Sequence, residues 1–288
     1  CTYLVSHSLG AMPKRARTYL EKFADEWDGR GVRAWYEGWW TIGADTGNLL
    51  TTILGVQKNT ITMHQNATVA QSIVASCFSF EGKRRKVVLQ DLDFPTNHYL
   101  FDGLKRYGAE IVHVPSDGGI SAPIDRLVDA IDEDTALVPI SLVLFRSGCL
   151  QDVRPVVEKA HRVGARVVLD VYQAAGTIPM NLEALGVDFA VGGSVKWLCG
   201  GPGAGYLYVR PDLIPQLRPA VVGWAGHTAP FEFETGGIRY AEGIERFQSG
   251  TPNVPSLYSA RAGYEIVGVI GVPAIPTRSL ELSRPIIR

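Results

Sequence analysis

One stretch, residues 165–209, constrains the fold of this chain more than any other. It holds two short apolar runs, 167–169 and 187–190, whose length and composition are typical of buried parallel strands. Asp170 ends the first run, and Lys196 follows the second after a turn of small residues. Ligands bind at the carboxyl ends of the strands in open α/β sheets. The stretch therefore predicts an acid and an amine at one ligand-binding edge.

The spacing of Asp170 and Lys196 alone fits a simple salt bridge equally well. Glycine-rich segments at 192–194 and 200–205 flank the lysine and favour a ligand site, because glycine lets the backbone pass close to a flat molecule. The alternation in 205–209 is that of a strand. A dinucleotide-binding motif needs its glycines to open a helix, so the nucleotide-binding alternative is disfavoured.

The rest of the chain alternates strand and helix patterns. Apolar runs predict strands at 86–90, 110–114 and 136–143, and helical patterns occupy 13–28, 69–78, 124–131, 152–163, 253–270 and 274–288. Such an alternation predicts an α/β fold in which a mostly parallel sheet is wrapped by helices.

Composition narrows the class of function. The 28 basic and 29 acidic residues nearly cancel, so no overall field favours nucleic acid or an anionic membrane. No apolar run reaches the ~18 residues of a membrane span. The four cysteines form no C-x-x-C pair, which argues against a zinc site or a disulfide scaffold. We expect a cytoplasmic protein that acts on a small molecule without a metal.

The motifs around the acid and the lysine resemble a known cofactor core. Asp170-x-x-Gln173, Ser194-x-Lys196-Trp-Leu and the Gly-Pro-Gly at 201–203 are similar to pyridoxal-phosphate enzymes of the class V aminotransferase group, and most similar to the kynureninases. The resemblance implies the large domain of fold type I, with pyridoxal 5'-phosphate as cofactor. It makes Lys196 the Schiff-base lysine and Asp170 the partner of the pyridine nitrogen. Gln173 and Ser194 become cofactor-binding candidates.

A second motif lies before the helical pattern at 69–78. Backbone N–H groups at the start of a helix bind anions, and a threonine adds a hydroxyl donor. Local sequence alone favours a plain threonine N-cap at Thr68. Matched to the Asn-x-x-Thr turn of the family, Ala67 and Thr68 become candidates for binding the cofactor phosphate.

Two further strand ends carry candidates. Phe94-Pro-Thr96-Asn97 follows the strand at 86–90, and most aromatics in such places belong to the core. The resemblance to Phe-Pro-Ser-Asp of the kynureninases implies instead that Phe94 stacks on the pyridine ring and that Thr96 and Asn97 reach the cofactor, although Asn97 replaces an aspartate. Ser141 aligns with another position that contacts the cofactor.

Two loops after the lysine complete the resemblance. Trp224 lies in Val-Gly-Trp-x-Gly-His, and Thr251 lies in a Gly-Thr-Pro turn. A buried tryptophan and an ordinary turn are the local interpretations. In the family these loops contact phosphate, partly across a dimer interface, so Trp224 and Thr251 are cofactor-binding candidates and a homodimer is predicted.

The resemblance also suggests a division into domains. We expect an N-terminal arm and helix at 1–44, a pyridoxal-phosphate-binding large domain at 45–250 and the start of a truncated C-terminal small domain at 251–288. The first residue is Cys1, so we also expect residues upstream. The arginine that binds the substrate carboxylate in the family is expected in the missing C-terminal part.

The sequence leaves the exact reaction open. Val195 replaces the tyrosine that precedes the lysine in kynureninases, and Gln173 replaces their histidine. The favoured hypothesis is a pyridoxal-phosphate enzyme that cleaves an amino-acid substrate at its β-carbon by hydrolysis or elimination. The alternatives are an aminotransferase, a cysteine-desulfurase-like enzyme and a catalytically inactive homologue. No reactive loop cysteine can be identified, although Cys199 lies close to Lys196.

Overall fold

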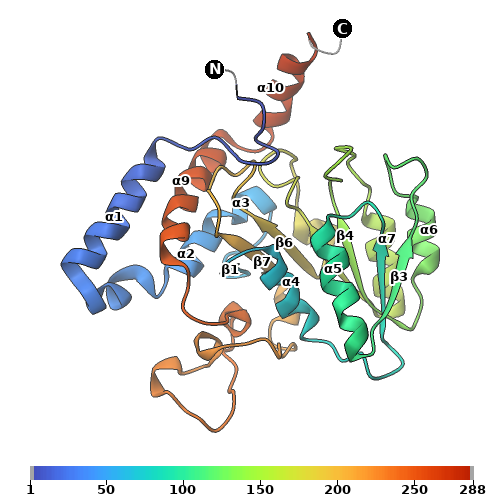
Figure 1. Ribbon diagram of the computed structural model, residues 1–288, viewed down its shortest axis with the longest axis horizontal. Helices are drawn as coiled ribbons and strands as arrows, with labels where there is room; N and C mark the ends of the chain where they lie inside the picture. The colour runs from blue at the N-terminus through green and yellow to red at the C-terminus, as the bar shows by residue number, and fades with distance from the viewer. Residues whose placement is uncertain (1–2, 286–288) are drawn as a thin grey trace.

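A seven-stranded sheet forms the centre of the protein in the computed structural model, which describes residues 3–285 (Figure 1). The strand order is β1-β7-β6-β5-β4-β2-β3. The strands are β1 (Ile61–His64), β2 (Lys86–Gln90), β3 (Glu110–Val114), β4 (Thr135–Ser141), β5 (Arg166–Asp170), β6 (Phe189–Gly193) and β7 (Gly205–Val209). Strand β7 pairs antiparallel with both β6 and β1, and the other pairs in the described sheet are parallel.

The central strands are covered on both faces. Every residue of β4, β6 and β7 is buried. Alternate side chains of a strand point to opposite faces, so Val167 and Leu169 of β5 join one core and Val168 joins the other. This explains why the strand sequences are continuously apolar rather than alternating.

Helices pack on both faces of the sheet and beside it (Figure 1). They are α1 (Arg15–Arg30), α2 (Ile42–Leu49), α3 (Thr51–Leu54), α4 (Ala67–Ala75), α5 (Pro95–Gly103), α6 (Ile124–Ala130), α7 (Arg154–Val163), α8 (Leu182–Leu185), α9 (Val254–Ile270) and α10 (Ala274–Ser283). The helices α1 and α9 lie side by side, where the Tyr19 hydroxyl bonds the Glu265 carboxylate at 2.5 Å and Arg15 pairs with it at 3.1 Å.

Local sequence explains where several helices begin and end. The Asn66 side chain accepts a hydrogen bond from the Val69 N–H at 3.0 Å and so caps α4. A proline in the first turn opens α5 and α7, where the missing N–H costs nothing. Gly164 ends α7 in the left-handed region with φ 79°, the usual position for a glycine C-cap.

The predicted fold class is confirmed. The strands expected at 86–90 and 110–114 have those bounds, whereas β1 was not expected. The last expected helix ends at Ser283 rather than at 288, and residues 286–288 lie outside the described part. Position 44 falls inside α2 and 251 lies just before α9, and the division into domains stays a prediction. Among residues 3–285, no helix has the length and apolarity needed to cross a membrane.

Candidate active site

A cavity of about 230 Å³ opens where strands β4 and β5 end, facing the first turns of α4 and α5. Nine of the twelve predicted site residues line it: Ala67, Thr68, Phe94, Thr96, Asn97, Ser141, Asp170, Gln173 and Lys196. Asn66, Gln71, Val143, Phe145 and Tyr172 complete the wall.

Asp170 ends β5 with few partners for its charge. Its Oδ1 accepts one hydrogen bond, from the Tyr172 N–H at 2.8 Å, and it pairs with no cation in the part of the chain that the structure describes. Burial raises the pKa of this carboxyl group to about 6, and the nearby charge of Asp93 adds to that effect, while the Tyr172 N–H and Lys196 oppose it. The carboxylate is therefore available to a cationic group bound in the cavity.

Lys196 extends into the same cavity between two aromatic rings. Its Nζ lies 4.7 Å from the ring centre of Tyr172 and 5.4 Å from that of Phe94. It makes no ion pair within residues 3–285. Burial lowers the pKa of Lys196, although the charge of Asp170 opposes the shift. A lower pKa leaves more of the neutral amine, which is the nucleophilic form.

The first turn of α4 forms one end of the cavity. Since Asn66 is the cap, the interpretation of Thr68 as a plain N-cap is wrong. The N–H groups of Ala67 and Thr68 lie in the first turn, where no helical partner exists for them. Together with the positive end of the helix dipole, these donors can hold a phosphate.

Ser141 is fixed by an acid that the sequence analysis missed. The buried Asp93 carboxylate accepts hydrogen bonds from the Ser141 N–H at 3.0 Å and from its hydroxyl at 2.7 Å. The Nε2 of Gln90 donates to the same oxygen at 2.9 Å, while burial raises the pKa of Asp93. Because the Ser141 hydroxyl donates to Asp93, its oxygen is left as an acceptor toward the cavity. The signal was present, since Asp93 directly precedes Phe94 at the end of a strand.

Asn97 is paired with a second residue that was missed. Gln71 of α4 donates from Nε2 to the Asn97 Oδ1 at 2.8 Å, and both side chains are buried. The Gln71 Oε1 and the Asn97 Nδ2 have no partner among the described residues. Leaving such atoms unpaired costs about 1–3 kcal/mol each, so a bound molecule that pairs with them gains affinity. Gln71 lies four residues after Ala67, hence on the same face of the helix.

Gln173 lines the cavity, but its carboxamide is engaged within the protein. Its Oε1 accepts from the Trp197 indole at 2.9 Å, and its Nε2 donates to the His7 carbonyl at 3.3 Å. The neighbouring Tyr172, another residue that was missed, lies two positions after Asp170 and reaches Lys196. Burial raises the pKa of Tyr172 to about 12, so its hydroxyl stays protonated.

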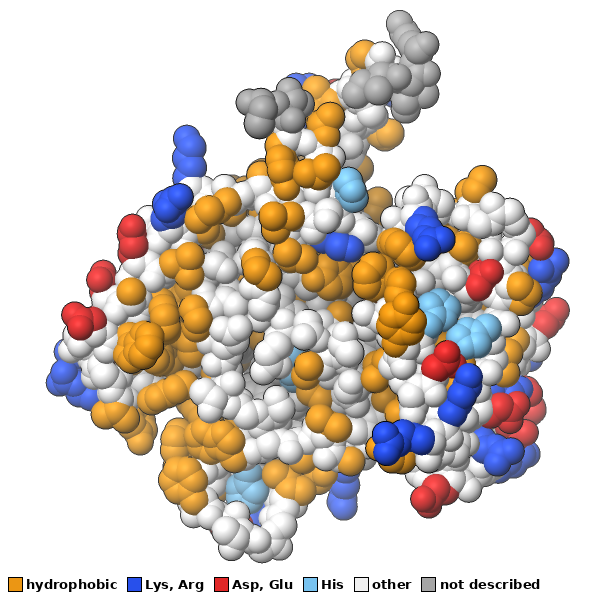
Figure 2. All heavy atoms as spheres, viewed as in Figure 1, with side chains coloured by type: hydrophobic (Ala, Val, Ile, Leu, Met, Phe, Trp, Pro, Cys, Tyr) orange, Lys and Arg blue, Asp and Glu red, His pale blue; other side chains and the backbone are white. Residues whose placement is uncertain are grey.

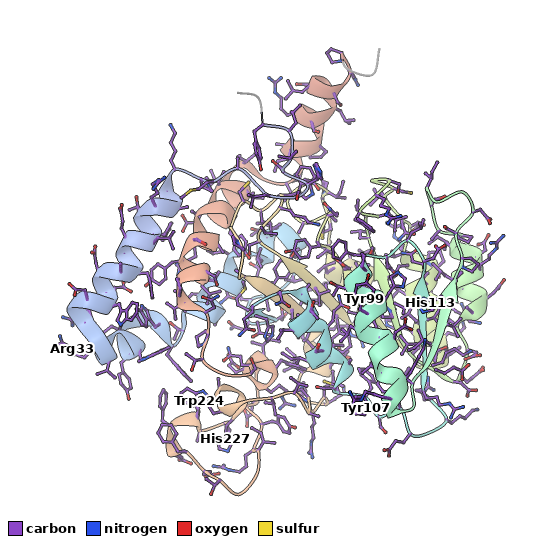
Figure 3. All side chains as sticks on the ribbon, viewed as in Figure 1. Arg33, Tyr99, Tyr107, His113, Trp224 and His227 are labelled. Atoms are coloured by element: carbon purple, nitrogen blue, oxygen red, sulfur yellow. The ribbon has the colours of Figure 1, made fainter. Side chains whose placement is uncertain are left out.

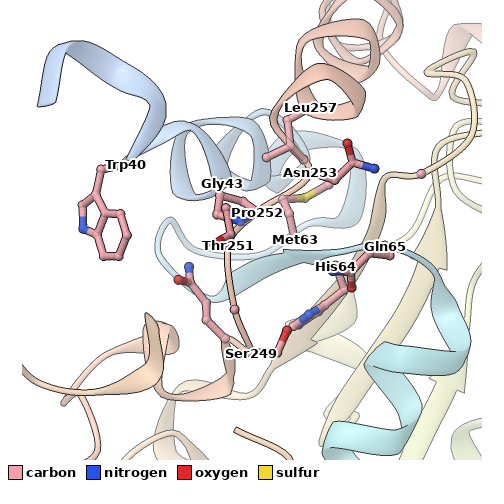
Figure 4. A pocket seen from close by; sticks show the side chains of 13 residues that line it. Trp40, Gly43, Met63, His64, Gln65, Ser249, Thr251, Pro252, Asn253 and Leu257 are labelled. Carbon is pink, nitrogen blue, oxygen red and sulfur yellow. The ribbon is translucent and has the colours of Figure 1, made fainter. Parts of the chain in front are cut away.

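Three predicted residues lie outside this cavity. Ser194 is buried, and its hydroxyl bonds the Ala204 carbonyl at 2.6 Å and the Tyr264 hydroxyl at 2.5 Å. Trp224 lies on the loop that extends below the sheet in Figure 3, with 39% of its surface exposed. Thr251 lines a separate pocket (Figure 4).

The Thr251 pocket has a mixed polar and apolar wall without an acidic side chain, a lysine or an arginine. Trp40, His64, Ser249 and Asn253 share its wall with Thr251 (Figure 4). Burial lowers the pKa of His64 to about 4, so the ring is neutral at ordinary pH, and its Nε2 has no partner in the described chain. Within one copy of the chain, Thr251 is therefore not part of the Lys196 cavity.

The glycines before the lysine differ in role from the expectation. A Cβ atom on Gly193 would lie 2.4 Å from the Tyr172 ring, and one on Gly192 would lie 2.2 Å from the Tyr206 hydroxyl. These glycines therefore make room for tyrosines of the protein itself rather than for a flat ligand directly. The expectation was wrong because the sequence does not show which side chain from elsewhere in the chain packs against the glycines of a strand.

The arrangement fits pyridoxal phosphate. Free N–H donors at the start of α4 suit its phosphate, and the poorly paired Asp170 suits its ring nitrogen. Lys196, with its lowered pKa, suits its aldehyde. No cluster of three or more histidine, cysteine or acidic side chains suited to a metal ion occurs in residues 3–285.

Comparisons with known proteins agree with this chemistry. The family model described as aminotransferase class-V matches residues 2–287. A kynureninase of Deinococcus radiodurans is 31% identical, with 99% of this chain and 70% of the relative covered. A kynureninase of Pseudomonas fluorescens is 29% identical, with 98% and 68% covered. An uncharacterized aminotransferase of Bacillus subtilis, YcbU, is 32% identical, with 79% and 59% covered.

Solved structures share the fold. A cysteine desulfurase of Thermococcus onnurineus NA1 superposes with a TM-score of 0.83 at 20% identity, over 97% of this chain and 70% of that one. The cystine C-S lyase C-DES gives a TM-score of 0.81 at 22% identity, over 92% and 71%. A variant of C-DES is described with glycine covalently linked to its PLP cofactor.

Proposed function

The chain belongs to the class-V aminotransferase family, and from this premise we propose that it cleaves an amino-acid substrate at the β-carbon, as a kynureninase-like hydrolase or lyase. It is a pyridoxal-phosphate-dependent enzyme. The observation that carries the proposal is the placement of Asp170, with a pKa raised to about 6, and Lys196, with a lowered pKa, in one cavity.

When bound, pyridoxal phosphate supplies an electron sink for charge that develops at the substrate's α-carbon. Lys196 would attach the cofactor and would afterwards hold or return a proton at its Nζ. Asp170 would hold the proton on the ring nitrogen, which is electrostatic stabilisation aimed at the transition state. Phe94 would help to exclude water from the ring. The first N–H groups of α4 would hold the phosphate.

The similarity to kynureninases along nearly the whole chain supports β-carbon cleavage. Transamination is the second candidate, because Val195 offers no hydroxyl for proton transfer and the Bacillus aminotransferase matches at 32% identity. The desulfurase reading is less favoured. Burial raises the pKa of Cys199, the cysteine next to the lysine loop, and so disfavours the thiolate that would accept sulfur.

Two measurements test the proposal. Borohydride reduction in the presence of pyridoxal phosphate, followed by peptide mass spectrometry, should place the cofactor on Lys196, and Lys196→Ala should lose that adduct. A panel of amino acids should then separate the reactions, since release of alanine from kynurenine indicates β-cleavage and keto-acid-dependent amine transfer indicates transamination. An adduct on Lys196→Ala would refute the assignment.

We also infer a homodimer. Five aromatic side chains pack together on one face, with hydrophobic atoms gathered at the lower left of Figure 2. They are Tyr36, Trp40, Trp224, Phe231 and Phe233. Phe233 is 69% exposed and Tyr36 is 79% exposed, which is unusual for a monomer surface. Trp40 also lines the Thr251 pocket, so the patch and that pocket form one continuous region.

Light scattering tests the dimer directly. A C₂ interface is the commonest oligomeric arrangement, and we expect twice the mass of the chain. Phe233→Ser should weaken the association without unfolding the protein, because the side chain is exposed. A monomer that binds pyridoxal phosphate tightly would contradict the dimer.

The same proposal includes a reducing compartment such as the cytoplasm. Cys77, Cys149 and Cys199 are all free thiols. Burial raises the pKa of Cys77 to about 12, so it stays protonated and unreactive. Mass spectrometry of protein isolated without reductant tests this point, and we expect unmodified thiols.

A further inference from the structure

The loop that carries Lys196, residues 194–200, is gripped from one side by the N-terminal arm. The Gly10 N–H donates to the Val195 carbonyl at 2.7 Å. A Cβ atom on Gly10 would lie 2.1 Å from the Lys196 carbonyl oxygen and 2.8 Å from the Cys199 Cα. Both distances are far below van der Waals contact, and both involve backbone atoms that cannot swing aside. Only glycine fits at position 10.

Helix α9 grips the same loop from another side. A Cβ atom on Gly263 would lie 1.9 Å from the Leu198 carbonyl oxygen and 2.9 Å from the Cys199 carbonyl carbon. The Ser259 hydroxyl donates to the Gly200 carbonyl at 2.9 Å. In Figure 1 the dark-blue arm crosses close to α9 on its way to α1. The lysine loop therefore lies between two segments from opposite ends of the chain.

The loop itself is bent to fit between them. Cys199 has φ 53°, a left-handed conformation that is unfavourable for a non-glycine residue. Its N–H donates to the Lys196 carbonyl at 3.0 Å and closes a tight turn. Gln173 links the turn to the arm, because its carboxamide joins the Trp197 indole to the His7 carbonyl. Strain of this kind persists only where the surroundings enforce it.

We propose that Gly10 and Gly263 are positioning residues that clamp the lysine loop and so set the reach of the Lys196 amine. The inference rests on the proposed attachment of pyridoxal phosphate to Lys196. In that step the neutral amine condenses with the cofactor aldehyde, a C=N bond replaces the C=O bond, and one water is released. A displacement of about 1 Å in such a group can cost about 10²-fold in rate. A methyl group at either glycine forces a displacement of the loop.

The test compares two cofactor forms on two variants. Pyridoxamine phosphate fits the same cavity, but it carries an amine and cannot join Lys196. We expect Gly10→Ala and Gly263→Ala to bind pyridoxal phosphate about tenfold or more weakly, and to be trapped by borohydride about tenfold or more slowly. The upper limit is the loss of about 10²-fold that a displacement of about 1 Å can cause. The affinity for pyridoxamine phosphate should stay unchanged, because it does not depend on the reach of the amine.

Matched glycines provide the controls. A Cβ atom on Gly82 meets nothing within 4 Å, and one on Gly268, also in α9, meets only the Thr52 hydroxyl at 3.9 Å. Gly82→Ala and Gly268→Ala should therefore bind both cofactor forms as the parent does. Gly268→Ala should also raise the melting temperature, since alanine is the better helix former.

The outcomes separate cleanly. An equal loss of affinity for both cofactor forms would mean that the whole site is damaged, and it would overturn the positioning role. A normal trapping rate in Gly10→Ala would also overturn the positioning role. If Gly263→Ala does not fold, Gly10→Ala alone decides, because its site is in a loop. Failure of the parent protein to form any adduct on Lys196 refutes the proposed function instead.

Discussion

Two aspartates at opposite ends of the same pair of strands have opposite surroundings. Asp188 precedes β6 at the amino edge and is fully buried. Its carboxylate forms ion pairs with the guanidinium groups of Arg166 at 3.2 Å and Arg210 at 3.0 Å. It also receives the His161 Nε2 at 2.9 Å and the Val167 N–H at 2.8 Å.

Asp170, at the carboxyl edge, receives a single backbone N–H. Burial raises its pKa to about 6, because the buried surroundings disfavour the charged form of the carboxyl group. Asp188 is saturated with partners and belongs to the stability of the sheet. A shortage of partners, rather than burial, therefore distinguishes a carboxylate reserved for a ligand from one that supports the fold.

We expect the greatest loss of stability when Asp188 is removed. Asp188→Ala leaves two guanidinium groups facing a buried gap, and loss of one partner of a buried ion pair costs about 3–5 kcal/mol. Urea unfolding should show that loss in the free energy of unfolding. The matched variant Asp170→Ala, which strands no ion-paired cation, should lose much less. Equal losses would erase the distinction between the two ends.

The next prediction concerns turnover at the unsaturated end. Asp170→Asn keeps the shape but removes the charge that holds the ring proton, so turnover should fall by about 10²–10³-fold, as for loss of one electrostatic stabiliser. Binding of pyridoxal phosphate should weaken by about 1.5–3 kcal/mol, a smaller loss. Steady-state kinetics and equilibrium binding measure the two. Parental turnover in the asparagine variant would make Asp170 a structural residue.

The free energy of unfolding of the cofactor-free protein should depend on pH through Asp170. The pKa of Asp170 is raised to about 6 in the folded state, above the ordinary value of about 3.9. The folded state therefore binds the proton on Asp170 more tightly than the unfolded state does. The stabilisation that comes from this protonation is complete below pH ~4 and is lost as the pH rises to ~6. At about 1.4 kcal/mol per pKa unit, the loss is on the order of 3 kcal/mol.

The variant Asp170→Asn isolates the contribution of the Asp170 carboxyl group to the pH dependence of stability. The difference in unfolding free energy between the parent and the variant should change across this pH window and be flat above it. Urea unfolding at closely spaced pH values provides the measurement. A difference that does not vary between pH 4 and 6 would show that the carboxyl group is not held in a costly charged state.

The smallest loss of stability should come from removing one partner of Asp188. His161 is partly exposed and is one of four donors to Asp188, so His161→Ala should cost about 1 kcal/mol, the usual net value of one hydrogen bond. The remaining donors still neutralise the carboxylate. Thermal unfolding should show a shift of a few degrees. A loss comparable to that of Asp188→Ala would mean that the histidine is the principal partner.

The sequence was most informative where a signal is local. Continuous apolar runs predicted β2, β3 and β5, and residues at strand ends predicted that Asp170 and Lys196 would share a cavity. Asp93 and Gln71 were missed, because their importance comes from contacts with residues far along the chain. Their hydrogen bonds form only after the helices have packed.

The glycines show the same limit from another direction. Their small size was evident, but the neighbour that required it was not. The Gly193 position accommodates Tyr172, and the Gly263 position accommodates the lysine loop. The roles of Ser194, Trp224 and Thr251 stay predictions, because in one copy of the chain these residues lie outside the cavity.

The contacts of the arm and α9 with the lysine loop have a consequence for the order of events in folding. The contacts of Gly10 and Gly263 join segments separated by most of the sequence, and closing so long a loop is entropically costly and slow. During synthesis the sheet emerges before α9, so the lysine loop lacks its contact with α9 until nearly all of the described chain has left the ribosome. We expect capture of the cofactor to be one of the last events in folding, after the sheet has formed.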